Sequence, residues 1–194
     1  MLDVARVMAW PFVPVTRLFA ERDTMLYALG VGAGLPAEDL RFVYEKALQA
    51  LPTMAAVLGS EVSWLADPRA GCAWQQVVHG EQRLTVHRPL PPAGSVTLRS
   101  RVEGISDKGE GRGAVISIAG QLSDAVTGNL LATLGTVLFL RGDGGCGSAG
   151  SVSEIGPPPP DRAPDHVLDL PTVPAQALLY RLSGDYNPIH VEDE

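Results

Sequence analysis

Three apolar segments separated by two glycine-bearing turns place the strongest limit on how this chain can fold. Residues 95–102 (SVTLRSRV) alternate between apolar and polar side chains, and residues 114–122 and 130–140 are apolar runs of strand length. The turn clusters DKGEGRG at 107–113 and SDAVTGN at 123–129 separate them. A period of two is typical of a strand, and turns this short join neighbouring strands. The pattern therefore predicts an antiparallel meander.

Two short helices are expected before the meander. Residues 23–31 (DTMLYALGV) begin with Asp23, which can cap free backbone N–H groups, and the glycines of residues 30–34 end the helix. Residues 51–59 (LPTMAAVLG) have Pro52 in the first turn, an apolar face and a terminal glycine. A helix as apolar as this second one has to be covered by other elements.

Strands can provide that cover. Residues 76–87 (QVVHGEQRLTVH) have strand character, and residues 40–44 (LRFVY) are expected to form a short strand. Together with the meander, these segments predict an α+β fold in which a twisted antiparallel sheet packs on one buried helix.

The composition changes after residue 140. Residues 141–165 are rich first in Gly and Ser and then in Pro, and they contain too few apolar residues to pack, so they are expected to form a linker. The chain is thus expected to consist of an N-terminal domain at 1–140, this linker, and the start of a C-terminal domain at 166–194. Residues 174–182 (PAQALLYRL) have helical character.

Charge and composition argue against several classes of function. The formal net charge is −7 and no run of Lys and Arg occurs, whereas a nucleic-acid groove or an anionic membrane surface would need the opposite charge. No apolar stretch is long enough to span a membrane, and the N-terminus does not resemble a signal peptide. Cys72 and Cys146 lack zinc-site spacing, so we expect free thiols and a cytoplasmic protein.

The segment LLYRLSGDYNPIH, residues 178–190, contains the most distinctive chemistry. Gly184 permits a tight turn, and Asn187 followed by Pro188 is typical of the start of a helix. His190 would lie in the first turn of that helix and Asp185 just before it. The turn can bring both side chains to one point, with Asn187 beside them.

Such a pair can move a proton. The positive end of a helix favours an ionised carboxylate at Asp185 and a neutral imidazole at His190, and both could act on one water molecule. Because no cysteine or elbow serine is placed to act as a nucleophile, the segment indicates addition or removal of water. An isolated Asp and His five residues apart would more often be a helix cap beside a surface histidine.

The segment also resembles the signature of the MaoC-like, or type 2, enoyl-CoA hydratase family. The matching positions are Tyr180, Leu182, Ser183, Gly184, Asp185, Asn187, Pro188, Ile189 and His190. Further stretches resemble the two-domain, eukaryotic-type members, namely YALGVGAG at 27–34, FVYE at 42–45, LPT at 51–53, HGEQ at 79–82, RPLP at 88–91, DKG at 107–109 and RGDGG at 141–145.

The resemblance implies a double hot-dog fold, in which each antiparallel sheet wraps around a long helix. The first hot dog accommodates the acyl chain, and the second carries the catalytic residues. It implies reversible hydration of trans-2-enoyl-CoA to (3R)-3-hydroxyacyl-CoA, with Asp185 and His190 activating water and handling the α-proton and Asn187 helping to position the water. It implies no cofactor and no metal, an acyl-CoA thioester substrate, and a homodimer or other self-association.

The family pattern continues beyond the motif, with a helix and a sheet that supply a backbone oxyanion donor. This chain ends at Glu194, so the first hot dog is expected to be complete and the second one only begun. Losing one oxyanion donor typically costs about 10²–10³ in rate. The expectation is therefore a C-terminally truncated hydratase of impaired activity.

Other polar residues are given lesser roles. His79 is expected to be structural, His87 and His166 show no clear partner, and Glu192–Glu194 are expected to be solvated rather than to hold a metal. The arginines that could meet CoA phosphates are left unassigned; they are Arg83, Arg88, Arg99 and Arg101.

Two other functions stay open. The chain could be a non-catalytic acyl-CoA-binding or dimerising hot-dog module, whose thioester binding would survive Asp185→Asn and His190→Ala. It could also be a hot-dog thioesterase, which would release free CoA. The hydratase signature argues against the thioesterase.

Overall fold

The structure is a computed structural model that describes residues 2–34, 37–152, 160–169, 171–184 and 191. Its strands are β1 (Val15–Phe19), β2 (Val77–Val86), β3 (Gly94–Asp107), β4 (Ala114–Asp124), β5 (Leu130–Leu140) and β6 (Ala149–Gly150). Its α-helices are α1 (Val4–Met8), α2 (Glu21–Gly30), α3 (Leu40–Val43), α4 (Met54–Leu58) and α5 (Gln176–Arg181). Four short 3₁₀ helices also occur, at Ala37–Asp39, Ser63–Ala66, Pro68–Ala70 and Trp74–Gln76.

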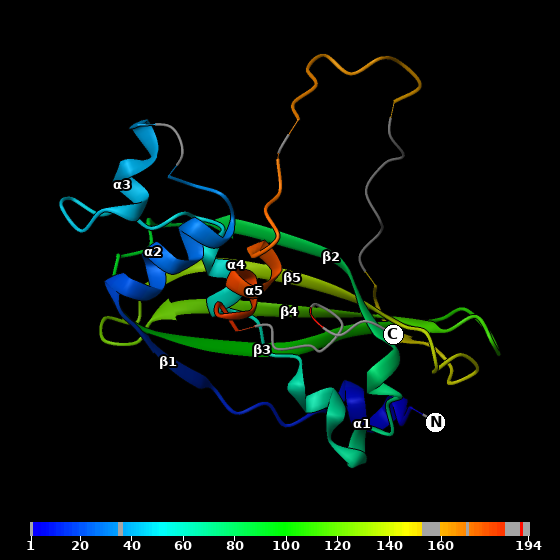
Figure 1. Ribbon diagram of the computed structural model, residues 1–194. Helices are drawn as coiled ribbons and strands as arrows, with labels where there is room; N and C mark the ends of the chain where they lie inside the picture. Colours follow the sequence, from blue (N-terminus) through cyan, green and yellow to red (C-terminus); the bar gives the residue numbers. More distant parts are fainter. Residues whose placement is uncertain (1, 35–36, 153–159, 170, 185–190, 192–194) are drawn as a thin grey trace.

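The strands form one antiparallel sheet in the order β1-β3-β4-β5-β2, with β6 added beside β3 (Figure 1). The expected meander is confirmed as β3, β4 and β5, and β5 has the predicted bounds. The strand predicted at residues 76–87 is β2, which pairs with β5. Because β1 and β2 are the two edges, the sheet is not closed.

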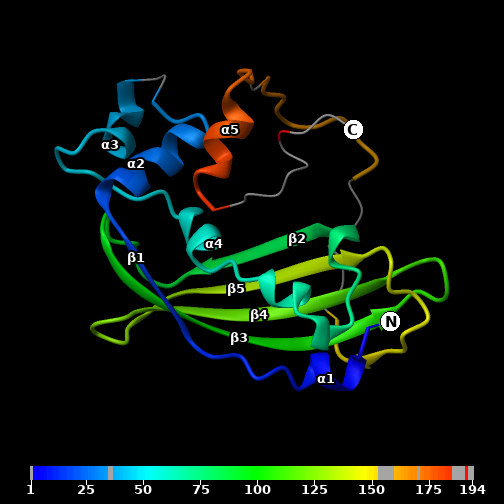
Figure 2. The same ribbon diagram turned by 60° about the horizontal axis from the view of Figure 1, so that its bottom comes forward.

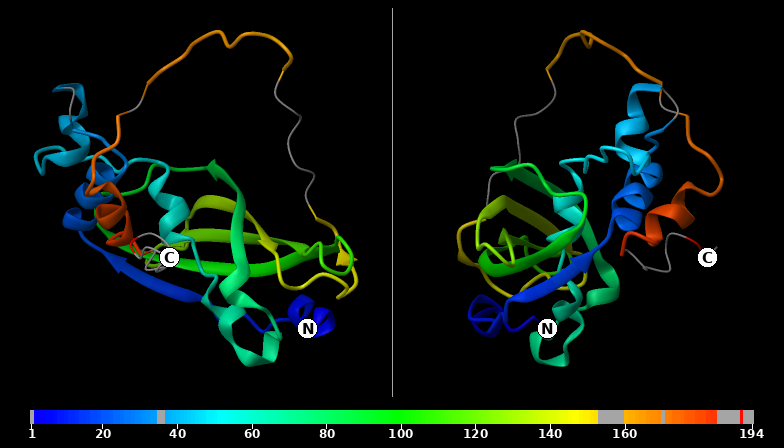
Figure 3. Two further views of the ribbon diagram at one scale, coloured as in Figure 1. Left: turned by 45° about the vertical axis from the view of Figure 1, so that its right-hand side comes forward. Right: turned by 90° about the vertical axis from the view of Figure 1, so that its left-hand side faces the viewer.

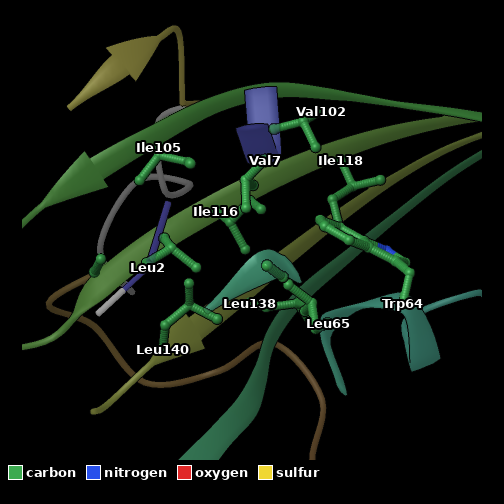
Figure 4. Close-up of a cluster of buried hydrophobic side chains, with 12 residues drawn as sticks. Leu2, Val7, Trp64, Leu65, Val102, Ile105, Ile116, Ile118, Leu138 and Leu140 are labelled. Carbon is green, nitrogen blue, oxygen red and sulfur yellow. The ribbon is translucent and has the colours of Figure 1, made fainter. Parts of the chain in front are cut away.

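One face of the sheet carries the core. Val96, Leu98 and Val102 of β3 are buried, as their alternation predicts. They share two buried clusters with Ile116, Ile118 and Leu122 of β4 and Leu134, Leu138 and Leu140 of β5. Two hydrophobic clusters divide this face. The first contains Val7, Leu65 and the ends of β4 and β5 (Figure 4), and the second contains Tyr27, α4 and the opposite ends of those strands.

Helix α4 lies against this face and the sheet curves around it (Figures 2 and 3). Of the predicted apolar face, Met54 and Leu58 are buried and Val57 is half-buried, and Ala55 is buried as well. The helix has only five residues, and the expectation of a long helix is wrong here. Pro52 precedes it and Gly59 follows it, and both residues favour helix ends rather than helix interiors.

Helix α2 confirms the helix expected near residues 23–31, but it begins at Glu21. The Asp23 carboxylate accepts a hydrogen bond from the Ala20 N–H at 2.9 Å, so Asp23 caps the helix from within its first turn. At the other end the Gly32 N–H bonds to the Leu29 carbonyl and the Ala33 N–H to the Ala28 carbonyl. Gly32 has φ +87°, and these features make a Schellman ending.

Residues 40–44 are not the predicted strand. Leu40–Val43 form α3, which packs on α2. The segment follows a 3₁₀ helix at Ala37–Asp39, and the Asp39 carboxylate accepts a hydrogen bond from the Gly34 N–H at 3.2 Å. The prediction was wrong because a short apolar run has no strand partner here and a helical start precedes it.

Residues 141–151 are more ordered than the sequence predicts. Asp143 is 3% exposed, β6 pairs with β3, and the Ser151 N–H bonds to the Glu103 carbonyl at 3.0 Å. The prediction that this stretch has nothing to pack with is therefore wrong, because polar contacts take the place of apolar ones. The domain boundaries themselves stay a prediction.

Arg17 of β1 fixes the end of α4 to the edge of the sheet. Its guanidinium donates to the carbonyl oxygens of Leu58 and Ser60, both at 2.5 Å, and pairs with Glu61 at 3.1 Å. The last carbonyl groups of a helix have no partner within the helix, so a guanidinium that reaches them satisfies several acceptors at once.

We expect Arg17→Met to lower the free energy of unfolding by about 2 kcal/mol, because it removes these bonds and leaves Glu61 partly buried without its cation. Urea unfolding followed by circular dichroism measures the change. Arg22→Met is the control, since the Arg22 side chain is 87% exposed, and it should change stability by no more than about 0.5 kcal/mol. Equal effects of the two substitutions would contradict this role of Arg17.

Candidate functional site

The described part of the motif begins on α5. Tyr180 lies in this helix, and Leu182, Ser183 and Gly184 follow it. The residues proposed from the sequence as catalytic, Asp185, Asn187 and His190, lie outside the described residues, as do Glu192–Glu194. The structure therefore describes how the chain arrives at the candidate site.

The last turn of α5 is tight. The N–H groups of Leu182, Ser183 and Gly184 each bond to the carbonyl three residues earlier, at 3.1, 3.0 and 2.9 Å. Gly184 has φ +121°, which is unfavourable for a residue with a side chain. The Gly of the Ser-Gly-Asp sequence thus has a non-helical backbone conformation.

Helix α5 packs on α2, although the two elements are far apart in the sequence (Figures 1 and 3). Gly30 lies in this contact, where a Cβ atom would lie 3.9 Å from backbone atoms of Leu179 and Tyr180. The glycine-rich YALGVGAG stretch and the LLYRLSGD stretch, which both resemble the hydratase family, are therefore neighbours in space.

Other residues of α2 hold this helix against the hydrophobic core. The Thr24 hydroxyl, which is 1% exposed, donates to the Pro92 carbonyl at 2.7 Å, and Tyr27 and Ala28 are buried. Tyr27 packs in the same cluster as Met54 of α4. The candidate site is thus connected to the core through α2.

A pocket of about 270 Å³ is lined mostly by apolar residues, among them Trp64 of the first hydrophobic cluster and Leu98 of the second. Trp10 and Phe12 also line it. The ring centroids of Trp10 and Trp64 are 5.0 Å apart, and those of Phe12 and Trp64 are 5.1 Å apart. Figure 4 shows Trp64 at the margin of the first cluster. Sequence patterns gave no signal for this pocket, because its residues are scattered along the chain.

The other histidines do not gather near α5. His79 and His87 are exposed on β2 and just after it; His79 Nε2 lies 3.2 Å from the Glu81 carbonyl, and His87 Nε2 lies 3.2 Å from Thr133 Oγ1. The expectation that His87 has no partner is therefore wrong. His166 is exposed.

The arginines considered for CoA phosphates do not form one cluster. Arg99 and Arg101 alternate with the buried residues of β3 and so lie on the outer face of the sheet. Arg101 pairs with Glu103 at 2.8 Å, and Arg83 pairs with Glu81. Two of the arginines are thus already neutralised by carboxylates.

Asp107 organises the loops at one end of the sheet. Its carboxylate accepts hydrogen bonds from the N–H groups of Gly109, Gly145 and Gly147, each at 2.8 Å. These three backbone donors hold the pKa of Asp107 below its usual range. The DKG and RGDGG stretches both resemble the family, and here one carboxylate joins them.

Asp143 joins a second pair of distant segments. Its buried carboxylate accepts from the Ala73 N–H at 3.1 Å and from the Cys72 thiol at 3.4 Å. Burial, reinforced by the Asp143 charge, raises the pKa of the Cys72 thiol to about 12. Burial and the nearby Asp107 charge also raise the pKa of Cys146. Neither thiol is activated as a nucleophile.

The curved antiparallel sheet packed on a short helix defines a hot-dog fold. In comparisons with known proteins, the MFE-2 hydratase 2 N-terminal domain matches residues 18–142, and the MaoC like domain matches residues 156–194. The chain belongs to the MaoC-like, hydratase 2 family.

Individual relatives agree with this family. The chain is 41% identical over 186 residues to 3-hydroxyacyl-thioester dehydratase Y of Mycobacterium tuberculosis, covering 91% of this chain and 61% of the relative. It is 35% identical over 202 residues to the peroxisomal enoyl-CoA hydratase 2 of Arabidopsis thaliana, covering 94% and 65%. The chain thus spans less than two thirds of the length of these curated relatives.

A solved structure confirms the fold. The crystal structure of a MaoC-like dehydratase from Phytophthora capsici is similar with a TM-score of 0.79 and 30% identity, covering 97% of this chain and 66% of that one. No helix in the described residues is long and apolar enough to cross a membrane.

The contacts of Asp107 predict a dependence of stability on pH. Because the folded-state pKa of Asp107 is lowered, its stabilising effect is present above the ordinary pKa of about 3.9 and is lost as the pH falls through the folded-state pKa. We expect Asp107→Asn to be less stable than the parent at pH 7 and the difference to shrink below about pH 4. Urea unfolding at several pH values measures it. Asp161→Asn is the exposed control, and a constant difference across the pH range would contradict the assignment.

The two thiols should differ in reactivity. At pH 8 a thiol of pKa about 12 has roughly 10⁻⁴ of its population as thiolate, so Cys72 should react with Ellman's reagent far more slowly than Cys146. The single-thiol variants Cys146→Ser and Cys72→Ser separate the two rates. Both rates should become similar in urea, and equal rates in the folded protein would overturn the buried Asp143–Cys72 contact.

Proposed function

We propose that the protein catalyses the reversible hydration of trans-2-enoyl-CoA to (3R)-3-hydroxyacyl-CoA. The single observation that carries this proposal is the complete signature at residues 180–190, in a chain that belongs to the MaoC-like, hydratase 2 family. The names of the relatives are consistent with it, since one is called a 3-hydroxyacyl-thioester dehydratase and another an enoyl-CoA hydratase.

In this proposal Asp185 and His190 hold and activate the water and handle the α-proton, and Asn187 helps to position the water. A carboxylate and a neutral imidazole suit this task, because one can accept a hydrogen bond from the water while the other moves a proton. The backbone of Gly184 supports the proposal, since its positive φ ends the helical turn that precedes Asp185 in the sequence.

The developing enolate oxygen also needs a hydrogen-bond donor, because negative charge appears there in the transition state. Family resemblance assigns this donor to a segment that follows the motif. We therefore propose the activity for the arrangement in which a second hot dog completes the site, whichever chain supplies it.

The first domain would accommodate the acyl chain. The pocket of about 270 Å³ is consistent with this role, because aromatic and aliphatic side chains line most of it. Its two rim carboxylates have cationic partners: Asp67 pairs with Arg69 at 2.6 Å and Glu61 pairs with Arg17. An uncharged, apolar tail suits such walls better than an ion.

Self-association is part of the proposal. Strand β2 is an edge strand and pairs within the described residues only with β5, so its other edge is available for another strand. A homodimer is the arrangement expected from the family. The cytoplasmic location stays a prediction, and the Arabidopsis relative is named peroxisomal.

A second candidate is a non-catalytic acyl-CoA-binding module. The pocket favours it, because the residues that line it in the described part of the chain all come from the first domain. The two candidates differ in one observable property: binding by the module would survive Asp185→Asn and His190→Ala, whereas hydration would not.

The first test is the loss of the enoyl-thioester absorbance when crotonyl-CoA is mixed with the purified protein. We expect the parent to remove the band and His190→Ala to slow its removal by at least 10²-fold, since a general acid–base group contributes 10²–10⁴. His166→Ala is the matched control, because His166 is exposed and far along the chain from the motif.

Each result has one meaning. Loss of the band in His190→Ala at the parent's rate would contradict the proposed role of His190. No loss in the parent, together with crotonyl-CoA binding in a calorimeter that survives His190→Ala, would replace the hydratase proposal with the binding module. Release of free CoA would indicate a thioesterase.

A further inference from the structure

Helix α5 is too short to hold its own position. It has six residues, and isolated helices need more than about twelve to persist in water. Leu178 and Leu182 remain 54% and 55% exposed, so the helix buries little of its own apolar surface. Its place therefore depends on the elements it contacts, and α2 is the main one among the described residues.

Gly30 lies in the contact between the two helices. The residue is buried, and a Cβ atom built on it would meet the backbone of Leu179 and Tyr180 at 3.9 Å. Contact with backbone differs from contact with a side chain, because backbone cannot rotate away. A methyl group fits this gap as an ordinary van der Waals contact, whereas a longer side chain would have to push the two helices apart.

Helix α2 cannot easily give way. Thr24 bonds to the Pro92 carbonyl, Tyr27 and Ala28 are buried, and the Schellman ending at Gly32 fixes the last turn. A side chain added at Gly30 should consequently displace α5 rather than α2. The displacement would pass to Gly184, three residues beyond the end of α5, and so to the point from which Asp185 continues.

We propose that Gly30 is a positioning residue for the hydration reaction: a side chain no larger than a methyl group at this position lets α5 lie at its present distance from α2, and this distance sets the point at which the catalytic motif leaves α5. This inference rests on the proposed hydratase function. It gives the first domain a part in catalysis besides accommodating the acyl chain, and it assigns a role to the first glycine of the GVGAG stretch.

The test compares Gly30→Ala with Gly30→Leu, and uses Gly30→Val if the leucine variant does not fold. Hydrogen–deuterium exchange of residues 176–184 measures the docking of α5, and initial rates with crotonyl-CoA give kcat and KM. We expect Gly30→Leu to exchange at least tenfold faster in that segment and to lose about 10²-fold in kcat, since a misplacement of about 1 Å can cost that much. KM should stay within about threefold of the parent.

The matched variant Gly30→Ala should stay within about twofold of the parent in both measurements. Exchange in β3, β4 and β5 should be the same in all variants, which separates local displacement from global unfolding. A lower kcat in Gly30→Leu without faster exchange at 176–184 would overturn the inference, because the effect would not pass through α5. Parent-like exchange and kcat would overturn it as well.

The same experiment distinguishes failure of the proposed function from failure of the inference about Gly30. A parent that does not hydrate crotonyl-CoA would refute the catalytic part of the inference together with the function itself. Exchange would then still decide whether Gly30 sets the position of α5, as a purely structural contact. A parent that hydrates crotonyl-CoA while both Gly30 variants keep its kcat would leave the function standing and refute the inference alone.

Discussion

The packing of α4 on the sheet is the contact on which the rest of the structure depends. It requires the two surfaces to lie close together, and Gly59 shows how close they are: a Cβ atom there would come within 2.6 Å of the Leu134 side chain. Arg17 then holds the end of α4 to the edge strand β1. Because α4 and Tyr27 of α2 share one hydrophobic cluster, the place of α4 also determines the place of α2. A change at Gly59 should therefore reach α5 through two successive packing contacts.

Much of the sheet could be predicted from the sequence, because period-two alternation reports burial directly. Leu130–Leu140 was correct to the residue, and Val96, Leu98 and Val102 are buried as predicted. Strand β3 continues beyond the predicted segment to Asp107, and its buried Ile105 was not predicted. Leu40–Val43 was not predicted correctly, since a stretch of four residues with three apolar side chains fits a strand and a helix turn equally well. Residues 141–151 were misjudged for a different reason. Asp107 and Asp143 hold this stretch by hydrogen bonds to backbone groups, and pairing between positions so far apart leaves no periodic signal.

The candidate site, like the fold, could be predicted from the sequence only in part. The sequence could propose Asp185, Asn187 and His190, because their spacing and their residue types express a chemical requirement. It could not place Gly30 against Leu179, since the contact depends on the three-dimensional path of the chain. The glycine-rich stretch was correctly expected to end α2, and Gly32 does so with φ +87°. Two glycines that look alike in the sequence thus act differently: Gly32 ends a helix, and Gly30 allows another helix to approach.

The α2–α5 contact also has to offset an entropic cost. For α5 to lie on α2, the chain after β6 must close a loop of about 25 residues, and the length-dependent part of that cost is roughly 3 kcal/mol. With Leu178 and Leu182 half exposed, the contact itself buries little apolar surface, so its net free energy is small. A small net free energy makes the position of the motif sensitive to a single side chain. The sheet is stabilised by two hydrophobic clusters and is therefore less sensitive to such a change. Substitutions at Gly30 should for this reason separate the position of α5 from the stability of the first domain.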